Sequence, residues 1–203
     1  MTDQDFYTTV AKSGTAEFKD RGSKFIGYVF PVASAEEFRE RLNDVKKEHP
    51  KATHHCFAYR LGLDGNTWRV SDDGEPSGSA GRPILGQIDS KSLVNTLVVV
   101  VRYLGGTLLG VPGLINAYKT AATLALQTTQ LVQKPVEKEF LVQFDYTQVG
   151  EIMTLVKQYN CRIVRQEMQL FCNMTIAVPR NRILELSYKL QEIRDVELSP
   201  VAG

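Results

Sequence analysis

The sequence contains little cysteine and no long apolar run, and both shortages narrow the class of protein. Its three cysteines stand at positions 56, 161 and 172, widely spaced and without a Cys-x-x-Cys pair. An odd, scattered set of this kind does not predict a disulfide framework or a structural zinc site. The longest aliphatic run, residues 97–101, is far too short to cross a membrane. We therefore expect a reduced, cytoplasmic protein that holds no metal and has no membrane partner.

The sequence also lacks an excess of charge of one sign. Its 24 Lys and Arg residues stand against 23 Asp and Glu residues, which gives a formal net charge of +1. The first twelve residues are polar and contain no apolar segment of the kind that forms a secretion signal. A domain that binds nucleic acid through its overall charge is strongly basic. Only a local basic surface therefore remains open for such binding.

The amino-terminal two thirds of the chain predicts a mixture of strands and helices. Ser34 and Glu37 form a capping box that starts a helix. Residues 72–91, rich in Gly, Pro, Asp and Ser, are expected to form one long loop. The other expected elements are strands at 13–20, 24–32, 54–61, 67–71 and 97–103 and a helix that begins near Pro112.

The pattern restarts after Gln133-Lys134-Pro135, which we interpret as a linker. Strands at 139–146, 161–168, 170–178 and 195–199 alternate with helices over 149–156 and 183–193. This βαββαβ order is typical of a ferredoxin-like domain. The fold class is therefore expected to be α+β, with two domains at 1–134 and 137–203.

Residues 71–83, here called the acidic loop, form the most unusual polar stretch. The loop's candidate site residues are Asp72, Asp73, Glu75, Ser77 and Ser79. Three interpretations stay open: its carboxylates hold a hard cation, its glycines and Arg82 hold a phosphate, or its side chains cap its own backbone. The spacing matches no calcium loop, Walker loop or dinucleotide fingerprint. It therefore names no catalytic residue and no cofactor.

Basic and aromatic residues accompany the strands of the first domain. The candidates for an anion-binding or nucleic-acid-binding face are Arg60, Arg69, Arg82 and Arg102, with Tyr59 and Tyr103 as stacking groups. Lys24, Trp68, Tyr28 and Phe57 stand near them in the sequence. Such strands resemble platforms for single-stranded nucleic acid. The alternative is that most of these aromatic rings pack in the core.

Two smaller motifs each have a functional and a structural interpretation. His54 and Cys56 can share one face of a strand, but two ligands do not make a zinc site. We favour a buried Cys56 and a hydrogen-bonded histidine. The pair Gly105-Gly106 could approach a phosphate at the start of a helix, or form an ordinary glycine turn.

Four sequence blocks together closely resemble the IMPACT family, and its bacterial two-domain branch, the YigZ type, in particular. The resemblance extends over residues 14–128 and continues over 137–200. The blocks are residues 54–60, 71–78, 80–83 and 101–110. The resemblance implies a first domain with the fold of ribosomal protein S5 domain 2. It implies a second domain similar to the last domain of elongation factor G.

The resemblance also implies a role in translation. Eukaryotic relatives regulate translation through a protein partner, and both folds occur in the translation machinery. Our first hypothesis is a non-enzymatic regulator that binds RNA, the ribosome or a translation factor. The alternatives are an enzyme that acts on a phosphorylated or nucleotide substrate at the acidic loop, and a purely protein-binding regulator. The distance between Arg102 and the acidic loop distinguishes a structural clamp from an open site.

Overall fold

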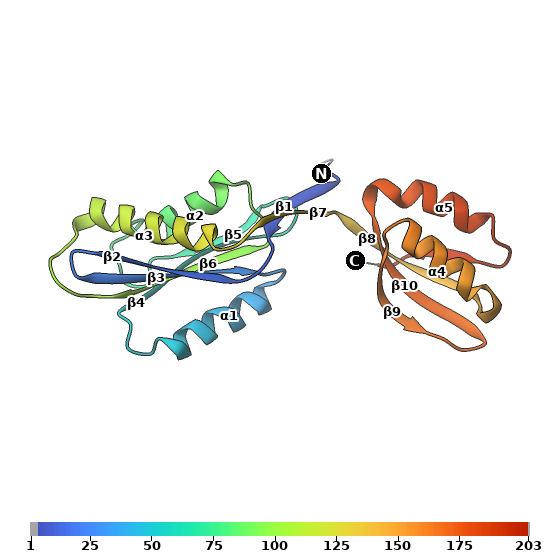
Figure 1. The fold of residues 1–203 in the computed structure, drawn as a ribbon, viewed down its shortest axis with the longest axis horizontal. Helices are drawn as coiled ribbons and strands as arrows, with labels where there is room; N and C mark the ends of the chain where they lie inside the picture. The colour runs from blue at the N-terminus through green and yellow to red at the C-terminus, as the bar shows by residue number, and fades with distance from the viewer. Residues whose placement is uncertain (1–3, 203) are drawn as a thin grey trace. The chain divides into compact units, whose positions relative to one another are not determined.

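The computed structural model describes residues 4–202 and divides the chain into two compact units (Figure 1). The first unit runs over Tyr7–Lys134, and the second comprises the chain from Pro135 onward with residues 4–6. Residues 1 and 203, the outer ends of the two expected domains, lie outside the described residues. The expected two-domain α+β fold is confirmed.

The first unit is built on a five-stranded sheet with the strand order β2-β3-β6-β4-β5. All neighbouring strands are antiparallel. The strands are β2 (Gly14–Asp20), β3 (Ser23–Pro31), β4 (His54–Leu61), β5 (Thr67–Ser71) and β6 (Thr96–Tyr103). The apolar run of the sequence forms the central strand, β6, and every residue of β6 before Tyr103 is buried.

Helices cover both faces of this sheet (Figure 1). The helix α1 (Ala35–Glu48) lies on one face, and α2 (Gly81–Ser90) and α3 (Gly110–Gln127) lie on the other. Successive side chains of a strand point to opposite faces. Val98 and Val100 accordingly pack in the core beneath α2 and α3, whereas Val99 and Val101 pack in the core beneath α1. The alternation directs Arg102 to the side of α2 and α3.

Two segments that were expected to be irregular contain regular secondary structure. The stretch 72–91 is not one loop, because α2 begins at Gly81. Its glycines and Pro83 hide a helical pattern in which Ile84, Leu85 and Ile88 are buried. The boundary between the two units does fall within the expected linker, between Lys134 and Pro135. That segment is not irregular, because it belongs to a strand, β7 (Leu131–Pro135), which pairs with the unexpected strand β1 (Phe6–Val10).

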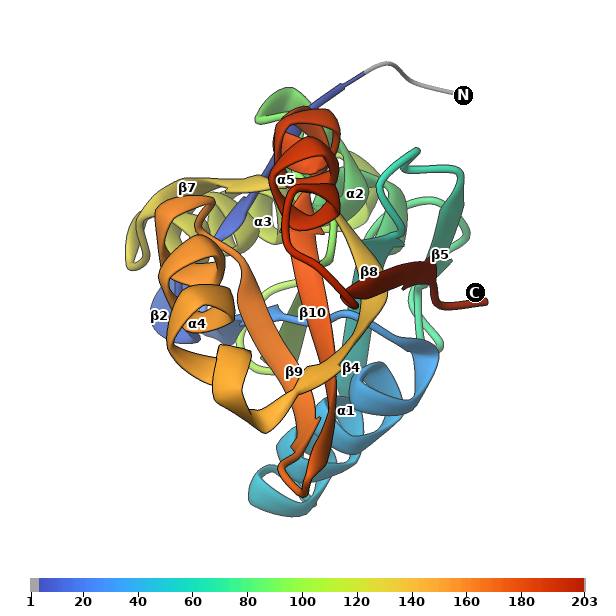
Figure 2. The same ribbon diagram turned by 90° about the vertical axis from the view of Figure 1, so that its right-hand side faces the viewer.

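The second unit has the expected βαββαβ order. Its sheet has the strand order β11-β8-β10-β9, and all pairs are antiparallel. Figure 2 shows β10 beside β9 and β8. The elements are β8 (Glu137–Asp145), η1 (Tyr146–Gln148), α4 (Val149–Gln158), β9 (Arg162–Glu167), β10 (Phe171–Pro179), η2 (Arg180–Arg182), α5 (Ile183–Gln191) and β11 (Glu197–Pro200). The helices α4 and α5 lie on one face of this sheet (Figure 1) and leave the other face uncovered by helices.

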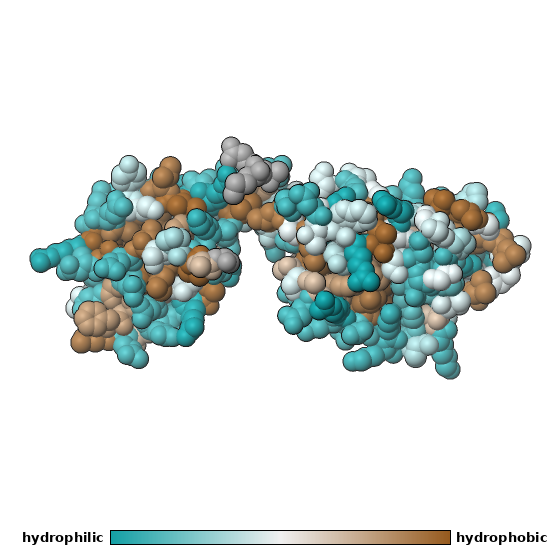
Figure 3. Space-filling model, turned by 180° about the vertical axis from the view of Figure 1, so that it is seen from behind, coloured by the Kyte–Doolittle hydropathy of each residue, from teal (hydrophilic) through white to brown (hydrophobic). Residues whose placement is uncertain are grey.

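The surface mixes polar and apolar side chains. Figure 3 shows hydrophobic residues (brown) interspersed with hydrophilic ones (teal) over the face in view. Among residues 4–202, no helix combines the length and the apolar character that a membrane span requires.

Candidate functional site

The carboxylate of Asp72 holds the second half of the acidic loop. One oxygen, Oδ1, accepts backbone N–H groups from Ala80 and Gly81 at 3.0 and 2.8 Å, and Oδ2 accepts that of Gly78 at 2.9 Å. Burial alone would raise the pKa of Asp72, but these three hydrogen bonds outweigh it and lower the pKa below its usual value. The carboxylate therefore fixes the turn that leads into α2.

The next residue ties the acidic loop to β4. The carbonyl oxygen of Asp73 accepts a hydrogen bond from Nδ1 of His54 at 2.7 Å, and its Oδ2 accepts the backbone N–H of His55 at 2.6 Å. Asp73 and Gly74 both adopt left-handed backbone conformations, with φ of 41° and 88°. The glycine suits this turn because it carries no Cβ.

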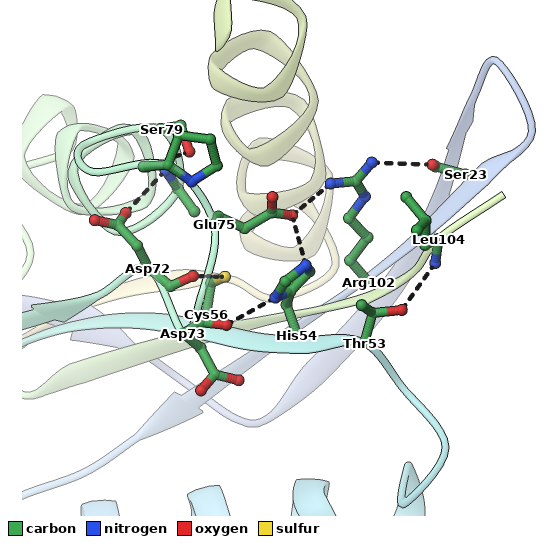
Figure 4. Close-up of polar contacts among 12 residues, drawn as sticks. Ser23, Thr53, His54, Cys56, Asp72, Asp73, Glu75, Ser79, Arg102 and Leu104 are labelled. Carbon is green, nitrogen blue, oxygen red and sulfur yellow. Dashed lines mark hydrogen bonds and ion pairs between the residues drawn. The ribbon is translucent and has the colours of Figure 1, made fainter. Parts of the chain in front are cut away.

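A buried ion pair between Arg102 of β6 and Glu75 of the acidic loop forms the centre of a polar cluster (Figure 4). Nη1 of Arg102 donates to Oε1 of Glu75 at 2.6 Å, and their side chains are only 5% and 4% exposed. The hydroxyl of Tyr118 on α3 donates to the same oxygen at 2.6 Å, and Nε2 of His54 lies 3.6 Å from it. Arg102 is therefore in direct contact with the acidic loop, which is the arrangement expected of a structural clamp rather than of an open site.

Arg102 also reaches the hairpin formed by β2 and β3. Its Nη2 donates to the hydroxyl of Ser23 at 3.3 Å, and its guanidinium lies 5.5 Å from the ring centroid of Phe25. Its Nε is buried and has no hydrogen-bond partner among the described residues. The guanidinium thus joins three segments that are distant in the sequence, and almost none of it faces solvent.

Two further groups complete this polar core. The thiol of Cys56 donates to the carbonyl oxygen of Asp72 at 3.0 Å, and burial raises the pKa of Cys56 far above its ordinary value. Burial likewise raises the pKa of Tyr118. Both groups stay protonated at neutral pH, so Cys56 is not a thiolate nucleophile. The favoured interpretation of a buried Cys56 and a hydrogen-bonded His54 is confirmed.

The glycine pair serves a close approach between backbones. A Cβ added at Gly106 would lie 2.0 Å from the carbonyl oxygen of Arg21, and one at Gly105 would lie 2.4 Å from that of Gly22. Gly106 also has a φ of 63°. The pair packs on the tip of the β2–β3 hairpin. This contact explains the glycines without a bound phosphate.

The structure does not bring the four candidate arginines together. Arg102 is buried, and Arg60 forms an ion pair with Asp89 through two of its nitrogens. Arg69 lies over Phe57, 5.8 Å from its ring centroid, on the α1 side of the sheet. Arg82 lies 5.0 Å from the ring centroid of Trp68. The expected single anion-binding face is therefore divided.

The two candidate stacking tyrosines are also engaged internally. Tyr59 is buried beside Phe38 and Phe57, which confirms the alternative that aromatic rings pack in the core. Tyr59 cannot stack on a base unless the core opens. The hydroxyl of Tyr103 is hydrogen-bonded to Nδ1 of His49 at 2.8 Å. The other nitrogen of the His49 ring, Nε2, lies 2.6 Å from the hydroxyl of Tyr28.

The remaining loop candidates offer no assembled catalytic set. Ser79 is fully buried, and its hydroxyl donates to the carbonyl oxygen of Pro76 at 2.6 Å. Ser77 is exposed. Within the described residues, no cluster of three or more His, Cys, Asp or Glu side chains is arranged to hold a metal ion. The contacts of Asp72 support the interpretation of a rigid loop that caps its own backbone, and those of Asp73 and Glu75 fasten the loop to neighbouring elements.

Sequence reasoning missed several participants in this cluster. Tyr118 lies within the helix expected after Pro112, and Ser23 lies between the strands expected at 13–20 and 24–32, but neither residue stood out as a site candidate. Their contacts with Glu75 and Arg102 join positions 43 and 79 residues apart in the sequence. No local pattern carries such a signal. The sequence analysis also did not single out the exposed apolar side chains of Leu104, Leu108 and Val111.

Comparison with known proteins places the chain in a family. The model of the Impact N-terminal domain matches residues 21–126, a stretch that holds the acidic loop and Arg102. The chain belongs to the IMPACT family. The resemblance noted in its sequence is thereby confirmed.

Bacterial members of the IMPACT family match along most of the chain. IMPACT family member YigZ of Escherichia coli (strain K12) is 34% identical over 172 residues, which cover 84% of each chain. IMPACT family member YvyE of Bacillus subtilis (strain 168) is 37% identical over 72% of this chain and 67% of its own. A crystal structure described as that of a hypothetical protein covers 98% of this chain and 99% of its own, with 31% identity and a TM-score of 0.77.

Proposed function

We propose that this IMPACT-family chain is a translation-associated regulator that binds RNA, alone or on the ribosome, and does not act as an enzyme at its acidic loop. One observation carries the proposal: Trp68 is 42% exposed on the edge strand β5 and lies beneath the guanidinium of Arg82. An exposed aromatic ring next to an arginine is a stacking platform for an unpaired base. The family's resemblance to proteins of translation supports the same direction.

The surroundings of Trp68 fit a nucleic-acid strand. β5 ends the sheet, and Thr67, Trp68 and Arg69 are all exposed on it. Arg82 has no carboxylate partner in an ion pair within the described residues. A cation without a carboxylate partner beside a stacking ring provides a phosphate contact of the kind that single-stranded RNA needs. We assign the RNA-binding role to this surface, the Trp68 edge, defined by Trp68 and Arg82; Arg69 lies on the opposite face of β5.

Trp68 is the single tryptophan of the chain, so its fluorescence reports directly on the Trp68 edge. The full chain would be titrated with a single-stranded RNA of mixed sequence while tryptophan fluorescence and RNA anisotropy are recorded. We expect quenching together with an anisotropy rise, and an affinity that falls as salt increases. Arg82→Ala should weaken binding.

The matched control is Arg39→Ala, which removes an exposed arginine from α1 on the opposite face of the sheet. Its effect on RNA affinity should be negligible. Anisotropy that rises without quenching would place RNA elsewhere and overturn the site. No binding at low salt to either RNA or purified ribosomes would overturn the function.

A specific observation also favours a regulator that works through protein contact. Leu108 is 83% exposed and Leu104 is 59% exposed, next to the loop that packs on the β2–β3 hairpin. Exposed apolar residues grouped in this way are typical of protein-binding surfaces. Leu108→Asp should abolish ribosome co-sedimentation that persists after nuclease treatment if protein contact dominates. It should leave the affinity for isolated RNA unchanged.

A further inference from the structure

A groove in the second unit has no part in the surfaces described so far. It encloses about 670 Å³ at the end of the sheet where β8 finishes and β10 begins. The residues that line it and carry the argument are Gln143, Asp145, Phe171, Arg194, Asp195 and Glu197. All belong to the second unit, so the groove is defined without reference to the first.

Strand register places the main groups of this groove on one face. Gln143 of β8 pairs with Asn173 on one side and with Glu197 on the other. Two residues further along β8, on the same face, Asp145 pairs with Phe171. The intervening positions on these strands, such as Val142 and Phe144, lie in the core. Alternation therefore directs the strand residues of the groove to the face that α4 and α5 leave uncovered.

The charge of the groove is predominantly negative. Three carboxylates, those of Asp145, Asp195 and Glu197, line it against one guanidinium, that of Arg194. Arg194 lies 3.4 Å from Asp195, and both side chains are almost fully exposed. An excess of carboxylates repels phosphate and attracts cations. The groove is thus unsuited to the RNA backbone and suited to a basic group.

Phe171 determines which basic group fits best. Its side chain is 75% exposed, an unusual position for a phenylalanine on a central strand. Its cross-strand neighbour Asp145 accepts from Thr147 through Oδ1, and within the described residues Oδ2 has no partner. A guanidinium stacks on an aromatic ring through its flat face and pairs with a carboxylate through its edge. A ring and a free carboxylate oxygen on adjacent strands satisfy both requirements.

We propose that this groove binds an arginine side chain presented by a basic segment of a partner protein. The guanidinium lies over Phe171 and pairs with Asp145 and Glu197, while the amides of Gln143 and Asn173 border the partner's backbone. The inference goes beyond the proposed function, because it concerns another unit and another class of partner.

The test uses the full chain, labelled with ¹⁵N, and a short arginine-glycine peptide as the probe. Matched peptides carry lysine or the uncharged citrulline in place of arginine. We expect amide shifts at Phe171, Asp145 and Glu197 with the arginine peptide, weaker shifts with lysine and none with citrulline. Phe171→Ala should weaken binding about two- to fivefold, the range for an exposed cation–π contact. Glu197→Gln should weaken it as well.

Tyr188→Ala provides the control for loss of an exposed aromatic ring, because Tyr188 is 69% exposed on α5 and does not line the groove. Its affinity for the peptide should match that of the parent chain. Equal binding of arginine and citrulline peptides, or binding that Phe171→Ala leaves unchanged, would overturn the proposal. So would RNA that shifts these amides when the peptide does not. RNA binding at the Trp68 edge can fail or succeed independently of each result.

Discussion

Arg102 and Glu75 form a buried ion pair, 2.6 Å long, that fastens the end of the central strand to the acidic loop. The sequence alone left two meanings for this arginine, a contact with a ligand or a clamp. The observed burial on both sides of the pair favours the clamp. The presence of these two residues in the family motif is then explained by their contribution to the stability of the fold, whether or not the motif also contacts a binding partner.

Removal of Arg102 should destabilise the protein strongly. Arg102→Ala leaves the carboxylate of Glu75 buried without its cation, and we expect a loss of about 3–5 kcal/mol in the free energy of unfolding. Urea unfolding followed by circular dichroism measures it. Arg69→Ala, at an exposed position, should change the free energy of unfolding by less than about 0.5 kcal/mol. A similarly small effect at Arg102 would contradict the clamp.

The same ion pair predicts that substitutions of Glu75 and Arg102 have strongly non-additive effects on the free energy of unfolding. The double variant Glu75→Gln with Arg102→Met removes both charges together. It should cost less than the sum of the two single substitutions, since neither leaves the other's charge unpaired. Additive losses in a double-mutant cycle would show that the two side chains do not interact.

Asp72 should make stability depend on acid pH. Its pKa is lower in the folded state than in the unfolded chain, because three backbone N–H groups stabilise the carboxylate. The resulting stabilisation is complete above the ordinary aspartate pKa of about 4 and is lost as pH falls through the lower folded value. Asp72→Asn should be less stable at pH 7 and should lose less stability on acidification. Chemical unfolding at pH 7 and pH 3 compares the two chains.

His49 should add a second pH dependence at milder acidity. Burial lowers the pKa of its imidazole, whose two nitrogens contact the hydroxyls of Tyr28 and Tyr103. The unfolded chain therefore takes up a proton more readily than the folded one. Stability is complete above the ordinary histidine pKa of about 6.5 and declines as pH falls below it. His49→Gln should flatten that decline between pH 7 and pH 5. An unchanged slope would exclude His49 as its source.

Two glycines should respond in opposite directions to alanine. Gly106→Ala forces a Cβ against the carbonyl of Arg21 at a φ of 63°, so a loss of more than about 1 kcal/mol is expected. Gly86→Ala meets no atom within 4 Å and lies within α2, where alanine is favoured by about 1 kcal/mol. Thermal unfolding should show the first variant melting lower and the second higher than the parent chain. Equal shifts would refute the hairpin contact of Gly106.

The elements that the sequence predicted well are those with a clear local period. The aliphatic run of β6 and the alternation along β8 each fix a strand and its buried face. The helix α2 escaped notice because Gly81, Pro83 and Gly86 are typical of loops, while its three buried residues form too short a pattern. Arg69 illustrates a signal that was present but unused, because it pairs across strands with the buried Tyr59 and so shares its face.

The candidate site was harder to predict because its contacts are tertiary. The partners of Glu75 lie on β6 and α3, and only folding brings them near. Residue types at the acidic loop were compatible with a cation site, a phosphate site or a self-capped turn. The three backbone donors to Asp72 favour the last of these, and such donors leave no trace in a sequence.

The acidic loop has a consequence for hydrogen exchange. Its composition would lead one to expect amide protons that exchange with solvent within seconds. The amides of Gly78, Ala80 and Gly81 instead donate to Asp72. A second carboxylate of the loop, that of Glu75, anchors it to Arg102 of the central strand. Deuterium uptake at the amides of Gly78, Ala80 and Gly81 should therefore be slow. These amides should exchange through the same opening event that exposes β6, so that residues outside the sheet exchange as part of it.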